Sequence, residues 1–367
     1  MKNSQLLLEY LQEYSIDEEI YRRYYELAPD PAARAAYVAG LDSELIRSRN
    51  ILIPDYPGVY FPTEIAEEYF DSNPPIFLDS SSSSVYLSKH YRYTPAIEHS
   101  HNYFEIIYML SGSCRQTLDG KDLPLHAGDL CFIPPHCKHS LNVFDDSIAI
   151  NLILRRKTFE HVFFNVLCLN SVLASFFMSH LYSKHPMKRI VFSTKDDPEI
   201  RDAVLEMYLE SHSQDRYSAF LLENMVAVFF AKVLRGYSRS ASVMQAKGHA
   251  NNEKAMELLS YINQNYQNLN LRDLALHFHY SPEHCSRLIK EETGRNFTAI
   301  LRSSRINRAC DLLSSTRQSI SSISEEVGYE NPETFIRAFV KEMQLTPGKY
   351  RKKTQIPGAD FTAPGIG

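Results

Sequence analysis

Two ten-residue segments near the C-terminus carry side chains that can read DNA bases. Segments 281–290 and 331–340 align without a gap at an offset of 331 − 281 = 50 positions, and each has an arginine six positions after its first residue. These arginines are Arg287 and Arg337. A guanidinium group can donate two hydrogen bonds to the edge of a guanine in the major groove. Because repetition at a fixed offset indicates one supersecondary unit used twice, we interpret the segments as a tandem pair of base-reading elements.

Each segment is expected to form a helix that begins at a capping residue. Ser281 and Asn331 can accept hydrogen bonds from free amides of the first turn, and the proline that follows each has no amide donor to lose. Amphipathic patterns at 271–278 and 320–327 predict a shorter helix before each segment, with a short turn between. A helix, a short turn and a second helix make up the helix-turn-helix, which reads DNA through its second helix.

Residue spacing assigns the faces of the two longer helices. Side chains at i, i+3 and i+4 share one face, which we expect to point into the core. Apolar Ile336 and Val340 then lie on a face that should be wet, which favours contact with thymine methyl groups. The alternative is a solvated face with one salt bridge, but two aligned copies favour DNA reading. The inward sets are Cys285, Leu288 and Ile289, and Phe335, Ala338 and Phe339; the outward sets are Glu283, Ser286, Arg287 and Lys290, and Glu333, Ile336, Arg337 and Val340.

A long helical pattern at 297–314 joins the two units. A rigid helix of this kind would hold two reading helices on successive major-groove faces, about one DNA turn (~34 Å) apart. Its arginines Arg302, Arg305 and Arg308 could touch phosphates, or could only keep the exposed side soluble.

Residues 253–353 resemble the DNA-binding domain of the AraC/XylS-type transcriptional regulators. Three positions depart from that pattern: Cys285 and Ile289 replace larger apolar residues, and Gln344 occupies a turn position that is often glycine. The resemblance is carried by Leu274, Ala275, Ser281, Ser286, Arg287, Leu288, Glu292, Thr293, Gly294, Phe297, Arg305, Ile306, Ala309, Leu312, Leu313, Ile323, Val327, Gly328, Tyr329, Phe335, Arg337, Phe339, Thr346, Pro347, Tyr350 and Arg351.

This resemblance implies a transcription factor that binds double-stranded DNA, responds to a small-molecule effector and acts as a homodimer, with RNA polymerase as a possible partner. It adds Thr334 to the expected base contacts. We therefore predict DNA contacts from Glu283, Ser286, Arg287, Lys290, Glu333, Thr334, Ile336 and Arg337.

The charge distribution agrees with this prediction. Residues 252–353 hold 15 Lys+Arg and 12 Asp+Glu, a net of +3, and the remainder holds 39 − 15 = 24 Lys+Arg and 44 − 12 = 32 Asp+Glu, a net of −8. The positive charge thus lies where electrostatic DNA binding requires it. A chain of 367 residues suggests two or three domains. No apolar run reaches membrane-spanning length, no secretory signal is evident, and six cysteines without framework spacing favour a cytoplasmic protein.

Upstream, short strand patterns separated by turns predict an all-β sandwich or barrel between 76 and 156. Within it, the segment 99–105, then Gly128 with Pro134, then His139 resembles the two sequence motifs of the cupin barrel. The expected strands lie at 85–87, 104–110, 114–118, 129–133 and 148–154.

The cupin resemblance implies a divalent metal site at His99, His101, Glu105 and His139, because imidazole and carboxylate groups suit Fe, Mn, Zn or Ni. The alternative, which we favour, is a barrel without a cofactor that holds a small molecule, such as a sugar. The ligand pocket would then use His99, His101, Tyr103, Glu105, Arg115 and His139, helped by Tyr108. Two further alternatives remain: a DNA-binding regulator whose barrel senses a metal ion, and a metal-dependent cupin enzyme, which would leave the tandem helices unexplained. We expect no catalytic residues.

We therefore expect a multi-domain α+β protein. Helical patterns at 200–210 and 217–234 predict a pair of helices after the barrel, and the second is apolar enough to be buried against the barrel or a second subunit. The expected parts are an N-terminal helical extension at 1–75, with helices at 5–14, 18–27 and 31–47; a cupin-like barrel at 76–156; a helical dimerisation region at 157–235; a linker at 236–252; an all-α tandem helix-turn-helix domain at 253–353; and a flexible tail at 354–367.

Overall fold

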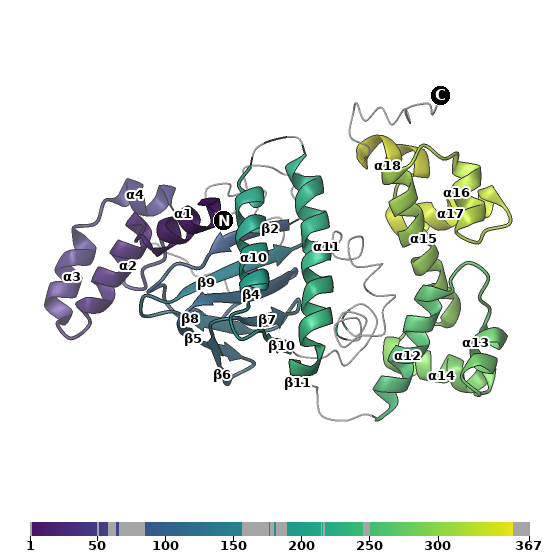
Figure 1. The fold of residues 1–367 in the computed structure, drawn as a ribbon, viewed down its shortest axis with the longest axis horizontal. Coiled ribbons are helices and arrows are strands. Elements are labelled where there is room, and N and C mark those ends of the chain that lie inside the picture. Colours follow the sequence, from purple (N-terminus) through teal and green to yellow (C-terminus); the bar gives the residue numbers. More distant parts are fainter. Residues whose placement is uncertain are drawn as a thin grey trace. The chain divides into compact units, whose positions relative to one another are not determined.

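The computed structural model describes residues 2–49, 51–57, 64–65, 85–155, 176, 180, 189–213, 215, 217–244 and 250–354. The chain forms two compact units (Figure 1). The described helices and strands up to Met244 belong to the first unit, and those from Ala250 onward belong to the second. In the described residues no helix is long and apolar enough to cross a membrane.

Antiparallel sheets form the centre of the first unit, which we call the β-domain. The larger sheet has the order β11-β10-β7-β4-β9-β2, and the smaller has the order β6-β5-β8. All five strands expected from the sequence are confirmed. The strands are β2 (Val85–Lys89), β4 (Phe104–Ser111), β5 (Ser113–Leu118), β6 (Lys121–His126), β7 (Asp129–Ile133), β8 (His139–Asn142), β9 (Ile148–Leu154), β10 (Arg189–Ser193) and β11 (Ser242–Met244); β1 (Glu64–Ile65) pairs in parallel with β3 (Ser100–His101).

The structure places strands in two segments for which the sequence predicted none. The segment 157–235 is not wholly helical, because β10 adds to the larger sheet beside β7 with Ile190 and Phe192 fully buried. The expected linker 236–252 is also partly structured, since α11 extends to Tyr237, β11 pairs with β10, and α12 begins at Ala250. Short, alternating strands that are distant in sequence from their partners carry a weak local signal.

Helices α10 (Pro198–Ser211) and α11 (Ser218–Tyr237) confirm the expected helical pair, and they run side by side over the larger sheet (Figure 1). Asp197 caps α10 in front of Pro198, the arrangement that favours a helix start. In α11, Val226, Phe229, Phe230 and Val233 face inward. Phe230 packs against Phe132 of β7, so the apolar character of α11 is used at least partly within this unit.

The N-terminal extension is helical, as expected, and we call its described residues 2–57 the N-terminal layer. The expected helix 31–47 is interrupted, because Asp42 caps a separate α4. A capping box between Ser15 and Glu18 starts α2. Positions 58–63 and 66–75 of the expected extension lie outside the described residues. The helices are α1 (Lys2–Gln12), α2 (Ile16–Glu26), α3 (Pro31–Ala39) and α4 (Ser43–Ser48).

A buried ionic cluster attaches the N-terminal layer to the β-domain. Glu18 is 0 % exposed and accepts hydrogen bonds from Lys89 Nζ at 2.7 Å and from Arg92 Nε at 2.9 Å. The same two cations also donate to backbone carbonyls of the turn between α1 and α2, including that of Glu13. Burial alone would raise the pKa of Glu18, but the hydrogen bonds from Arg92 and Lys89 outweigh it and lower this pKa.

The second unit contains two helix-turn-helix units joined by α15, as expected. Phe335 and Phe339 of α17 are fully buried in its core with Ile306 of α15. The turns differ by one residue: His279 has φ 56° in the first, and Gly328 has φ 90° in the second. The helices are α12 (Ala250–Gln264), α13 (Leu271–His277), α14 (Pro282–Thr293), α15 (Phe297–Ser315), α16 (Ile320–Glu326), α17 (Pro332–Met343) and α18 (Pro347–Thr354).

We predict that Glu18→Gln lowers the free energy of unfolding by about 3–5 kcal/mol, because it leaves Arg92, 1 % exposed, without its anionic partner. Urea unfolding of the full chain would measure this. The control Glu26→Gln, on the same helix but with exposed pairs to Arg22 and Arg23, should cost less than about 0.5 kcal/mol. The lowered pKa of Glu18 means that its contribution is present above its unfolded value of 4.5 and is lost as pH falls further. Equal losses in both variants would contradict this role.

We also predict that Gln344→Gly stabilises the second unit by about 0.5–1 kcal/mol. Gln344 ends α17 with φ 55°, a left-handed conformation that glycine adopts without steric cost. Gly294 occupies the matching end of α14 with φ 72°, so Gly294→Ala should destabilise by about 1 kcal/mol. Thermal unfolding of the full chain, followed by far-ultraviolet circular dichroism, measures both changes, and a shift of the same sign in the two variants would disprove the explanation.

Candidate ligand cavity and nucleic-acid interface

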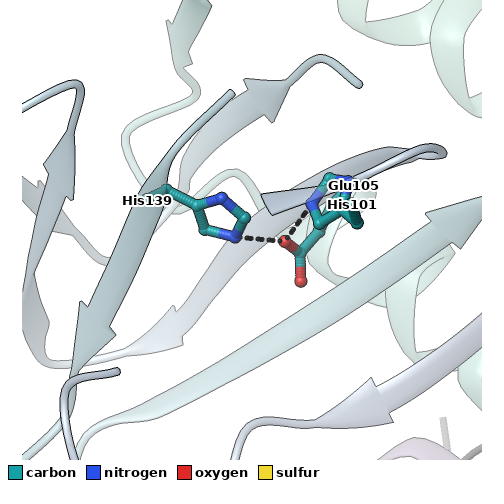
Figure 2. Close-up of side chains that lie close together, drawn as sticks. All are labelled: His101, Glu105 and His139. Carbon is teal, nitrogen blue, oxygen red and sulfur yellow. Dashed lines mark hydrogen bonds and ion pairs between the residues drawn. The ribbon is translucent and has the colours of Figure 1, made fainter. Parts of the chain in front are cut away.

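Three buried polar side chains from three strands converge inside the β-domain (Figure 2). His101 comes from β3, Glu105 from β4 and His139 from β8. One oxygen of Glu105, Oε2, lies 3.1 Å from Nε2 of His101 and 3.1 Å from Nε2 of His139. Their exposed fractions are 0 %, 7 % and 2 %. We call these three residues the His–Glu cluster.

Backbone contacts determine which nitrogen of each imidazole carries a proton. His101 Nδ1 lies 2.8 Å from the carbonyl oxygen of Tyr103, and His139 Nδ1 lies 3.0 Å from that of Cys137. A carbonyl oxygen can only accept, so both Nδ1 atoms must donate. In the neutral imidazoles both Nε2 atoms then present lone pairs to the acceptor oxygen of Glu105. Each Nε2–Oε2 contact therefore needs either an added proton or a cation between the two atoms.

Burial and the contacts within the cluster shift the pKa values of its three members in different directions. Burial tends to raise the pKa of Glu105, but hydrogen bonds from His101 and His139 bring it well below its usual range. Burial tends to lower the pKa of His139, but the Glu105 carboxylate raises it, whereas burial prevails at His101 and lowers its pKa. An ionised Glu105 with a protonated His139 would leave the lone pair of His101 Nε2 facing an anionic oxygen.

This geometry fits a divalent metal ion. The ligand atoms of the His–Glu cluster all lie within 4.8 Å of one another. Backbone carbonyls that hold the opposite ring nitrogens are the usual outer partners of metal-ligating histidines. His99, the fourth ligand implied by the cupin resemblance, lies outside this convergent group. Its Nδ1 is 3.0 Å from the Ile97 carbonyl oxygen, and burial lowers its pKa to about 4, so His99 is neutral.

A cavity of about 520 Å³ opens beside the His–Glu cluster. Four of the six predicted pocket residues line it: His99, Tyr103, Glu105 and His139. His101 lies behind them, stacked on the Tyr103 ring with a 4.0 Å centroid distance.

The expected pocket role of Arg115 is wrong, because its side chain is 71 % exposed and lies 3.9 Å from Asp122. Strand alternation explains this, since neighbouring Cys114 and Gln116 take the inward positions of β5. Tyr108, expected to help, is buried but does not line the cavity.

The remaining walls of the cavity come from segments that the sequence did not connect with it. Tyr10, Asp17 and Arg49 belong to the N-terminal layer, Tyr208 belongs to α10, and His212 caps the C-terminal end of that helix. Asn151 of β9 also lines it, and its Oδ1 is buried without a hydrogen-bond partner among the described residues. A polar residue within the apolar run 148–154 was the one available signal, because a buried central strand is expected to be apolar.

The second unit presents the predicted DNA-contact residues on the open faces of α14 and α17. The predicted inward residues are buried, except that Ala338 is half-buried. Arg287 contacts His284 Nδ1 at 2.9 Å, and Ile336 is apolar yet 36 % exposed. Seven of the predicted contact residues are exposed (Glu283, Arg287, Lys290, Glu333, Thr334, Ile336 and Arg337), and Ser286 is half-buried.

Two arginines of α15 are used inside the unit. Arg305 donates to the carbonyl oxygens of Tyr266 and Gln267, both at 2.8 Å, which joins α15 to the end of α12. Arg302 pairs with Glu342 of α17 at 2.6 Å. These contacts hold the two helix-turn-helix units together. Because both guanidinium groups are bound within the protein, they argue against the alternative that Arg302 and Arg305 contact DNA phosphates.

Comparison with known proteins gives two family matches. Residues 82–151 match an AraC-like ligand binding domain, and residues 274–353 match a helix-turn-helix domain. The HTH-type transcriptional activator RhaR of Mannheimia succiniciproducens is 21 % identical over 278 residues, which cover 76 % of this chain and 94 % of that protein. The uncharacterised HTH-type regulator YfiF of Bacillus subtilis is 36 % identical over 104 residues, 28 % of this chain. This chain spans 33 % of YfiF and 11 % of a second B. subtilis regulator, YtdP.

Solved structures give similar but weaker matches. The C-terminal domain of AraT, a response regulator from Geobacillus stearothermophilus, is 30 % identical and covers 33 % of this chain and 98 % of its own, with a TM-score of 0.28. ToxT from Vibrio cholerae is 14 % identical and covers 74 % of this chain and 98 % of its own, with a TM-score of 0.30.

In this chain a β-domain that contains a cavity of ligand size precedes two helix-turn-helix units. The chain is thus similar to an AraC-like ligand binding domain in its first unit and to a helix-turn-helix domain in its second.

Proposed function

We propose that the protein regulates transcription by binding two adjacent major-groove segments of double-stranded DNA through α14 and α17. The observation that carries this proposal is the repeated geometry of the two helices. Both begin at a side-chain cap, at Ser281 and Asn331, and both expose an arginine six residues later. A helix of this kind can place its N-terminal side chains against base edges.

Small-molecule control of DNA binding is supported by the cavity in the β-domain. Its volume of about 520 Å³ is within the usual range for small ligands. Tyrosine rings together with polar edges would suit a sugar, which can stack a ring face and donate hydroxyl hydrogen bonds. For the effector to act allosterically, it must bind one arrangement of the protein better than another.

A cytoplasmic homodimer that cooperates with RNA polymerase completes the proposal. Support for a dimer comes from α11, where Phe220, Leu221 and Val228 are 57 %, 44 % and 56 % exposed. Such side chains on one helix are suitable for burial against a second copy. We assign no catalytic role to the protein.

We predict that Arg287→Ala and Arg337→Ala each weaken specific DNA binding by about 1–3 kcal/mol, because each loses a bidentate base contact. Genomic fragments captured by the purified protein would first define the binding site, expected as two half-sites about one helical turn (~10 bp) apart. Titration of that site then measures each variant. Binding to unrelated DNA should change little.

Arg115→Ala serves as the charge-matched control, because Arg115 is exposed on the β-domain. Unchanged affinity in both recognition-helix variants, or an equal loss in the Arg115 variant, would refute the assignment of base contacts.

The His–Glu cluster supports a second candidate, in which the β-domain senses a metal ion. His101, Glu105 and His139 would hold a divalent transition metal as a two-histidine, one-carboxylate site, which suits Fe²⁺, Zn²⁺ or Ni²⁺ and leaves positions open for another ligand. Bound metal would supply a Lewis acid at the edge of the cavity. The favouring observation is the pair of Nδ1–H donors, which directs both Nε2 lone pairs toward Glu105.

We predict that Glu105→Gln or His139→Ala weakens Co²⁺ binding at least tenfold, because each removes one of the three metal ligands. Calorimetric titration of the full chain, together with the visible absorption of Co²⁺, would measure the affinity. His126→Ala is the control, since His126 is exposed on β6. If the unaltered chain takes up no Co²⁺, or if all variants bind equally, the metal candidate fails while the proposed DNA-binding function stands.

A further inference from the structure

The N-terminal layer forms one wall of the cavity, although residues 2–57 lie outside both matched family domains. Its contribution comes from the end of α1, the turn after it, the first half of α2, and Arg49, Ile51 and Leu52. Opposite lie the strands of the β-domain, and α10 provides a third side. The cavity is therefore a site between three parts of one unit, and its shape depends on the position of the layer.

Docking of the layer is strong enough to define that wall. Glu18 is fully buried against Lys89 and Arg92, and both cations also bind backbone carbonyls of the turn that lines the cavity. Tyr14 adds to this attachment, since the Arg92 guanidinium lies 3.6 Å from the centre of its ring. The turn is thus held at several points, and a ligand in the cavity would contact an ordered surface.

Charged groups inside the cavity are paired with one another. Arg49 makes two hydrogen bonds to Asp17, Lys89 binds Glu18, and Glu105 contacts two histidines. Among the described lining residues, Glu13 is the remaining charged side chain, and it is exposed at the rim. A charged ligand would have to lose its hydration without gaining a free counter-ion, which costs several kcal/mol.

The cavity lining combines aromatic rings with a buried acceptor. Tyr10 of the N-terminal layer lines it together with Tyr86 of β2 and Tyr91, and aromatic faces favour contact with flat or ring-shaped groups. On β9, the unpaired Oδ1 of Asn151 is a buried acceptor that needs a donor. A suitable ligand carries a ring and at least one O–H or N–H group.

We propose that α1 and α2 are part of the effector site, and that the effector is an uncharged, ring-containing molecule with hydrogen-bond donors. It binds with its donors at Asn151 and its ring against the tyrosines of the N-terminal layer. This inference rests on the proposed function, because it assigns the ligand class of the same cavity. It gives the N-terminal layer a direct role in effector selection.

A single-tryptophan reporter can test this assignment, because the chain has no tryptophan. Tyr86→Trp places the reporter on the cavity wall. Two probes of matched size are titrated while Trp fluorescence is followed: para-nitrophenyl β-glucoside, which is uncharged, and para-nitrophenyl β-glucuronide, which differs by one carboxylate. We expect saturable quenching by the glucoside and at least tenfold weaker binding of the glucuronide. Equal binding of the two probes, or no saturable quenching by either, overturns the proposal.

A matched pair of variants on α1 tests the wall itself in this reporter background. Tyr10→Ala should weaken glucoside binding about fivefold, because it removes a lining aromatic face. Leu6→Ala, one turn earlier and similarly exposed at 62 % against 66 %, lies outside the cavity and should leave the affinity unchanged. Equal effects of the two changes would remove the N-terminal layer from the site. Capture of genomic DNA by the unaltered chain, measured separately, decides the proposed function, so the two failures can be told apart.

Discussion

The burial of Glu18 is the constraint on which the architecture of the first unit depends. A carboxylate without access to water must be matched by cations and hydrogen-bond donors, and here both cations come from the segment at the end of β2. The N-terminal layer is therefore bound to one place on the β-domain. Because Lys89 and Arg92 also bind the turn after α1, the same interaction shapes a wall of the cavity. The contacts that attach the N-terminal layer to the β-domain therefore also form part of the cavity.

A second buried carboxylate, Glu105, organises the interior in a different way. Its partners are histidines, which can give up their protons, whereas the partners of Glu18 remain charged. The backbone carbonyls of Tyr103 and Cys137 fix both imidazoles with Nε2 toward Glu105. That arrangement joins three strands through one oxygen atom. Either a proton or a metal ion can lie between this oxygen and each Nε2 atom. Glu18 is thus suited to a structural role, and Glu105 is suited to respond to a proton or a metal ion.

In the second unit, the rigid part is the framework and the exposed part is the reading surface. Arg305 connects α15 to the backbone of Tyr266 and Gln267, just after α12, and a side chain at Gly328 would collide with the Gln267 carbonyl oxygen, 2.1 Å from an added Cβ. The two helix-turn-helix units are therefore packed closely against shared elements. Their outward side chains make few interactions within the protein, which leaves Arg287 and Arg337 available for a ligand as large as DNA.

The sequence by itself determined the local elements of this protein. Caps at Ser281 and Asn331, apolar spacing in α14 and α17, and the repeat at an offset of 331 − 281 = 50 positions predicted the reading helices, because helix signals lie within a few residues of one another. Strand patterns located most of the β-domain, and the resemblance to the cupin motifs implied the residues of the His–Glu cluster, but neither showed that Arg115 points outward. Only the tertiary structure decided that β10 and β11 complete the larger sheet, that His99 lies outside the convergent group, and that residues 2–57 line the cavity. Those features depend on contacts between segments far apart in the chain, such as Glu18 with Arg92. The local sequence around either residue does not specify its partner.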